Sequence, residues 1–130
     1  MTDAITFTLD GRHDMGPTLW GDMISWQIEK GWPFGWEIMA WDNDTFVQLT
    51  TNYYYDMAPK VQGRQLTWYG WDGHDFEIFL YDRDKDVTTQ ITSNQYDDVA
   101  PVLADGVIAW EGYASAEADV FIYKDSQVRK

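Results

Sequence analysis

The stretch DMAPKVQGRQLTW, Asp56 to Trp68, decides the fold, because it occurs three times in register. The first copy is DMGPTLWGDMISW, residues 14–26, and the third is DVAPVLADGVIAW, residues 98–110. Each copy begins with aspartate, has proline as its fourth residue and ends with tryptophan, and neighbouring copies are 42 residues apart. Self-similarity at a fixed period of this length indicates a repeat architecture, in which one structural unit stacks on the next.

Each repeat divides into four short segments of strand character separated by turn residues. In the second repeat these segments are 59–62, 65–69, 76–81 and 87–92. The third segment is apolar on both faces, which predicts a strand buried between two sheets. The sequence therefore predicts an all-β fold, and four strands in about 40–45 residues are typical of a β-propeller blade. A single β-sandwich is the alternative, but it does not explain the constant spacing of the signature.

The repeat register also predicts how the chain ends fit together. It divides the chain into blades at residues 10–50, 51–92 and 93–130. The outer strand of the third blade would begin near Arg129, so this blade is expected to lack its own outer strand. Residues 4–9 match outer-strand positions, since Phe7 aligns with Leu49 and Ile91.

Three blades do not close around an axis, because propellers typically have about 4–8 blades. Two copies of the chain give six blades. We therefore expect a C2 homodimer that forms one ring, with residues 4–9 of each chain completing the third blade of the other. A trimer with nine blades is the second choice.

Four segments of the second repeat resemble the TolB-like, or WD40-like, propeller repeats: DMAP (56–59), WYGWDG (68–73), FEIFLYD (76–82) and TTQIT (88–92). The resemblance covers nearly the whole chain in three copies. It implies a propeller fold, and it implies a role as a binding platform more than any particular reaction.

Composition restricts the classes of partner. The formal net charge is −13, with 9 basic against 22 acidic residues. Nucleic acids and anionic membrane surfaces are therefore not expected as partners, because both require clustered lysine and arginine. Cysteine is absent, and the N-terminal residues show no signal peptide, so a cytoplasmic location is favoured.

Three aspartates recur in the connection before the first strand of each blade: Asp14, Asp56 and Asp98. One interpretation places them as carboxylates at one end of the channel, where they could meet a cation or a ligand. The other makes each a cap that accepts local backbone N–H groups. The acidic run 82–86 lacks the glycine and glutamate of a calcium loop, and no metal site or cofactor is predicted.

Blade geometry places the loops between the second and third strands on the same end as the loops between blades. The aromatic and polar residues of these loops are the predicted ligand-binding residues: Trp32, Tyr54, Trp71, His74, Tyr96 and Tyr113. Aromatic rings beside polar groups suit peptides, basic side chains or sugars.

No nucleophile motif, phosphate loop or nucleotide fingerprint occurs, so an enzyme is not expected. The predicted function is a self-assembling propeller module that binds a protein or peptide on the loop face. Lectin-like carbohydrate binding is one alternative, and a hydrolase or lyase on the same scaffold is another. A fragment or an engineered propeller without a function of its own is the remaining alternative.

Overall fold

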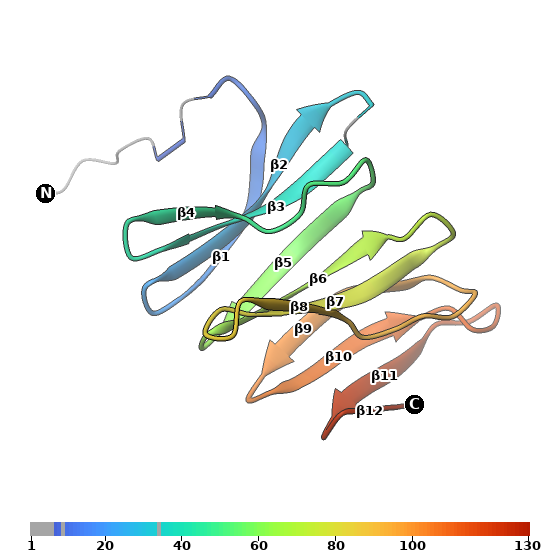
Figure 1. Cartoon of the computed structure of the whole chain (residues 1–130). Coiled ribbons are helices and arrows are strands. Elements are labelled where there is room, and N and C mark those ends of the chain that lie inside the picture. The colour runs from blue at the N-terminus through green and yellow to red at the C-terminus, as the bar shows by residue number, and fades with distance from the viewer. Residues whose placement is uncertain (1–6, 9, 34) are drawn as a thin grey trace, which may run out of the picture.

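The strands lie in three separate four-stranded sheets (Figure 1). The computed structural model describes residues 7–8, 10–33 and 35–130. In each sheet the strands follow one another in chain order, and all neighbouring strands pair antiparallel. The strands are β1 (Asp14–Trp20), β2 (Met23–Gly31), β3 (Gly35–Asp42), β4 (Thr45–Gln48), β5 (Asp56–Gln62), β6 (Gln65–Trp71), β7 (Phe76–Asp82), β8 (Val87–Gln90), β9 (Asp98–Ala104), β10 (Val107–Gly112), β11 (Asp119–Lys124) and β12 (Gln127–Arg129).

The three sheets stand side by side in chain order, and their first strands adjoin one another, β1 next to β5 and β5 next to β9. We refer to the sheets as blades 1, 2 and 3. The predicted all-β class and the three four-stranded blades are confirmed. Within the described residues no helix has the length and apolarity needed to cross a membrane.

The first strand of each blade starts earlier than the sequence suggested. β5 begins at Asp56 rather than at Pro59, and the proline lies at a bulge where the register with β6 shifts between Met57 and Lys60. The bulge accommodates proline because the ladder is interrupted there. Ala58, just before the proline, has φ of 54°, a left-handed conformation that alanine adopts only at an energetic cost.

The core lies between the blades rather than within one of them. Between blades 1 and 2 it contains Ile38, Leu66 and Trp68, and Leu49 packs against this cluster. Between blades 2 and 3, Ile78 packs with Trp110. Each sheet therefore buries its faces only where another sheet covers it, as expected for stacked repeats.

The expectation that blade 3 lacks its outer strand is wrong. β12 pairs with β11, with Lys124 opposite Gln127. The expectation took the turn before the outer strand from blade 2, where Asp82 pairs with Val87 across four residues. Blade 3 instead has a two-residue turn, Asp125–Ser126, with φ values of 52° and 61°. Positive φ at both positions gives a tight hairpin turn, so the outer strand starts earlier.

Of the segment 4–9 that was expected to complete another chain, residues 4–6 and 9 lie outside the described part. Phe7 packs against blade 1, with its ring centroid 5.8 Å from that of Trp26 and 5.4 Å from that of Trp41. This contact corresponds in the repeat to that of Leu49, which packs on the cluster that contains Trp68. Phe7 therefore occupies the position at which the last residues of a preceding blade would lie.

Candidate functional site

Each recurring aspartate accepts a hydrogen bond from the tryptophan of its own blade. The indole Nε1 of Trp68 donates to Asp56 Oδ1 at 2.9 Å, and the indole of Trp110 donates to Asp98 Oδ1 at 2.7 Å. Asp56 Oδ2 accepts a second bond from the amide of Asn52 at 2.7 Å. In blade 1 the equivalent bond, from Trp26 to Asp14 Oδ1, is 2.7 Å long.

Asp56 and Asp98 are 3% and 1% exposed. These two carboxylates are therefore not open at the end of the channel, and the bonds described above come from side chains rather than from the local backbone N–H groups that the capping interpretation expects. The spacing of 12 residues between aspartate and tryptophan in the repeat brings each indole to its carboxylate. A β-carbon at Gly70 would lie 2.2 Å from Asp56 Oδ1, so only glycine leaves room for this bond.

Three of the predicted ligand residues meet in one pocket on the loop face, between blades 2 and 3. A pocket of about 530 Å³ is lined by His74, Asp75, Gln95, Tyr96, Asp97 and Tyr113. The loop after β6, the connection from β8 to β9 and the loop after β10 each contribute to it. The pocket therefore joins two blades and combines two tyrosine rings with two carboxyl groups.

Hydrogen bonds fix the loops around this pocket. Asp97 Oδ1 accepts the backbone N–H of Phe76 at 3.0 Å, and its carbonyl oxygen accepts the N–H of Tyr113 at 2.9 Å. Asp97 thus connects the loop regions of both blades. The N–H of Tyr96 donates to Asn94 Oδ1 at 2.8 Å, which holds the connection from β8 to β9.

The other three predicted ligand residues lie elsewhere on the face. Trp32 is 95% exposed and lines a separate pocket of about 160 Å³ with Trp36 and Tyr55. Trp71 is half-buried and packs edge-on against Phe76, with ring centroids 5.2 Å apart. Tyr54 lies close to the loop after β6, where its hydroxyl would be 3.2 Å from a β-carbon at Gly73. The structure therefore does not unite the six residues into one site.

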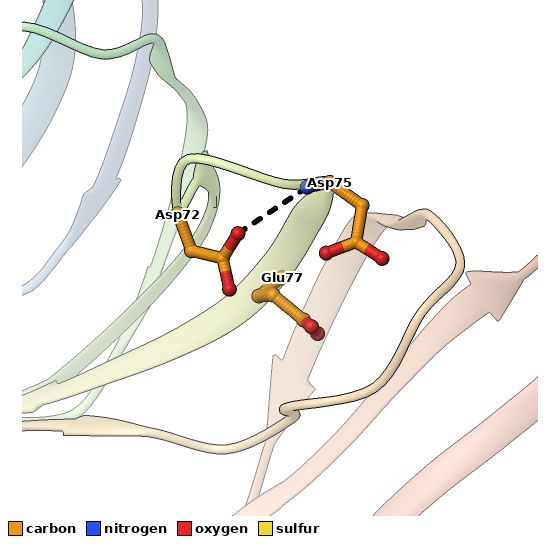
Figure 2. Close-up of side chains that lie close together, drawn as sticks. All are labelled: Asp72, Asp75 and Glu77. Carbon is orange, nitrogen blue, oxygen red and sulfur yellow. Dashed lines mark hydrogen bonds between the residues drawn. The ribbon is translucent and has the colours of Figure 1, made fainter.

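A cluster of three acidic side chains, Asp72, Asp75 and Glu77, lies beside the pocket (Figure 2). One carboxylate oxygen from each residue lies within 4.8 Å of the others. Burial raises the pKa of Glu77 to about 7, against the lowering effect of its bonds to Thr92 and Asn94. Burial also raises the pKa of Asp75, and the nearby charge of Asp72 adds to this.

No metal site was expected from the sequence, and this cluster was not among the predicted site residues. Its signal was the string DGHDFE at residues 72–77, which places three carboxyl groups in a short loop and at the start of a strand. Such strings are common in a chain with 22 acidic residues, and only the fold shows that two of these side chains are buried together.

No protein-family model matches the chain, and no curated protein matches its sequence. Solved structures match its fold. The propeller domain of the Trilobed protease from Pyrococcus furiosus has a TM-score of 0.76 at 8% identity, covering 96% of this chain and 38% of that one. The putative TolB from Agrobacterium tumefaciens has a TM-score of 0.70 at 15% identity, with 95% and 50% covered.

TolB from Acinetobacter baumannii gives a TM-score of 0.70 at 18% identity, covering 92% of this chain and 32% of that one. The chain thus spans half or less of the length of each of these three proteins. The resemblance inferred from the repeat signature is confirmed at the level of the fold: the three four-stranded sheets are arranged as blades of a β-propeller, similar in fold to the propellers of TolB.

Proposed function

We propose that the chain is a non-enzymatic, self-assembling propeller module that binds a basic segment of a protein or peptide in the pocket between blades 2 and 3. The observation that carries the ligand proposal is the meeting of Tyr96, Tyr113 and Asp97 in this pocket. A lysine or arginine side chain suits it, because tyrosine rings attract a cation and a carboxylate pairs with it. The net charge of −13 would favour the approach of a basic partner.

Peptide binding tests this proposal. Arginine-containing peptides from a random library should bind, and the same peptides with glutamine in place of arginine should bind at least about tenfold more weakly. Tyr113→Ala should weaken binding by a similar factor without lowering the melting temperature, because Tyr113 is 44% exposed.

Trp32→Ala is the matched control, since Trp32 is an exposed aromatic residue of the same face outside the pocket. Equal loss of binding in both variants would show that the pocket is not the site. Binding of neutral glycans, lost in Tyr113→Ala, would instead support the lectin-like alternative.

The self-assembly proposal comes from residues that are buried inside the stack but exposed at its ends. Ile38 and Ile78 are 0% exposed, whereas Val120, at the same position in blade 3, is 67% exposed. At the opposite end Leu19 is 69% exposed, while Val61, its equivalent in blade 2, is 7% exposed. Exposed apolar faces of this kind favour association. Blade 3 has no neighbouring blade on the face that carries Val120, and blade 1 of a second copy could cover this face with the one that carries Leu19.

A hydrogen bond that recurs in blades 1 and 2 also supports the self-assembly proposal. Thr50 Oγ1 accepts the N–H of Ile38 at 2.8 Å, and Thr92 Oγ1 accepts that of Ile78 at 2.9 Å. The repeat places Thr8 at the position of these threonines and Val120 at that of the isoleucines. We infer that Thr8 of a second copy accepts the N–H of Val120, so that two copies close a six-bladed ring, within the range of about 4–8 blades that propellers use.

A further inference from the structure

The third strand of each blade follows a loop of the loop face and carries an acidic residue at the same position in every blade. Glu37, Glu77 and Asp119 lie opposite Ile28, Gly70 and Gly112 in the sheet register. These acidic side chains are therefore structural equivalents, although their surroundings differ in charge.

In blades 1 and 3 a lysine accompanies this acidic residue. Lys30 lines the same pocket as Glu37, and its charge lowers the pKa of Glu37. In blade 3 the ammonium group of Lys130 lies 2.5 Å from the carboxylate of Asp119. Each of these two blades thus provides its own positive charge.

Blade 2 reverses this charge. The position of Lys30 is taken by Asp72, and Asp75 adds a second carboxylate. The charged neighbours that shift the pKa of Glu77 are Asp75 and Asp98, both acidic. The acidic residue of blade 2 is therefore placed among further acids instead of beside a lysine.

Two buried oxygens of this cluster have no hydrogen-bond partner. Glu77 is 0% exposed and Asp75 is 8% exposed, and Glu77 Oε2 and Asp75 Oδ1 are both unpaired. Glu77 Oε1 accepts the N–H of Asn94 at 2.8 Å, which fixes the carboxyl group in place. Buried oxygens without a partner are costly and call for an occupant of the space that they face.

The loop leaves one side of this space open to solvent. Asp72 is exposed, and its Oδ1 accepts the N–H groups of His74 and Asp75 at 2.9 and 3.2 Å. Figure 2 shows the carboxyl groups of Asp72 and Asp75 extending from the loop towards Glu77. An ion could therefore enter from the loop face and meet all three carboxylates.

We propose that Asp72, Asp75 and Glu77 bind a divalent cation of the calcium type, which takes the place of the lysines of blades 1 and 3. Hard cations of this type prefer carboxylate oxygens, at about 2.3–2.6 Å for calcium, so one ion can bridge oxygens up to roughly 5 Å apart. The separations within the cluster are compatible with this limit. Water completes the coordination on the exposed side.

Calcium binding by the full chain tests the proposal without any peptide ligand, so its outcome is independent of the proposed function. Titration calorimetry should detect one calcium ion per chain. At a calcium concentration about ten times the dissociation constant, the melting temperature should rise by roughly 5 °C relative to chelator at equal ionic strength. No calcium-dependent rise in the unsubstituted protein would overturn the proposal.

Asp75→Asn and Glu37→Gln form the matched pair of variants. Asp75→Asn should melt higher than the unsubstituted protein in chelator, because it removes repulsion, and it should lose the calcium response. Glu37→Gln changes the equivalent buried glutamate of blade 1 and should keep the full response. A calcium-dependent rise that persists in Asp75→Asn would overturn the proposal, since it would reflect screening of the net charge.

Discussion

The buried carboxyl group of Glu37 allows the cost of ionising a buried side chain in this fold to be measured. Glu37 is 1% exposed at the junction of blade 1 with its loops, and burial raises its pKa from 4.5 to about 7. An acid whose pKa is raised on folding destabilises the folded state when it must ionise. The cost appears as the pH rises above 4.5 and is complete above 7. A rise of this size corresponds to about 3 kcal/mol.

Glu37→Gln removes this cost because glutamine does not ionise, while its carbonyl oxygen can still accept the backbone hydrogen bond that Asn52 donates to Glu37. The gain in unfolding free energy over the unsubstituted protein should therefore be about 2–3 kcal/mol larger at pH 8 than at pH 5. Any penalty for burying the amide NH₂ group is the same at both values and cancels in this difference.

Urea denaturation at pH 5, 6, 7 and 8 in the presence of chelator measures this difference. Glu117→Gln is the control, because Glu117 is exposed in a loop and its substitution should act alike at all four values. An effect of Glu37→Gln that is constant with pH would refute the reasoning, since it would mean that the carboxyl group ionises in the fold at no extra cost.

Three further substitutions probe the contacts within and between blades, each measured by urea denaturation. Trp68→Phe removes the indole N–H that Asp56 Oδ1 accepts and should cost about 1–3 kcal/mol; no loss would show that this bond does not stabilise the blade. Asp42→Asn weakens the pairing with two arginines of blade 2 and should cost about 1 kcal/mol at pH 7, since one arginine is half exposed. These arginines lower the pKa of Asp42, so the difference should vanish as acid protonates Asp42, and persistence at low pH would contradict the ion pairing. Ala58→Gly relieves a positive φ and should be neutral or stabilise by up to about 1 kcal/mol, and a clear loss would contradict the strain.

The architecture could be predicted because the repeat expresses one physical rule three times. Each tryptophan of the signature pairs with the aspartate 12 residues before it and packs against an adjacent blade or segment. Apolar character on both faces of β7 indicated a sheet covered on two sides, and Ile78 and Tyr81 of this strand are buried. Such patterns are local and periodic, and a single sequence shows them.

The features that the sequence did not reveal depend on turn length and on contacts between loops. A two-residue turn at Asp125–Ser126 decides whether blade 3 reaches its outer strand, and composition does not distinguish it from a longer turn. Likewise, His74, Tyr96 and Tyr113 come from three loops, and only the packing of blades 2 and 3 brings them to one pocket while Trp32 stays apart.

The acidic cluster was missed for a related reason. Asp72, Asp75 and Glu77 belong to a chain rich in acids, and their pattern differs little from solvated loops elsewhere. Their significance comes from burial and from the comparison with Lys30 in blade 1, which requires the register of the sheets.

The mass of the chain in solution tests most directly the claim that its exposed end faces meet in a second copy. Light scattering after size-exclusion chromatography at micromolar concentration should give about twice the chain mass of 15.2 kDa. Val120→Lys should shift the mass towards that of one chain, because a charge then lies where an apolar contact is expected. A stable, folded species of 15.2 kDa in the unsubstituted protein would contradict closure by a second copy.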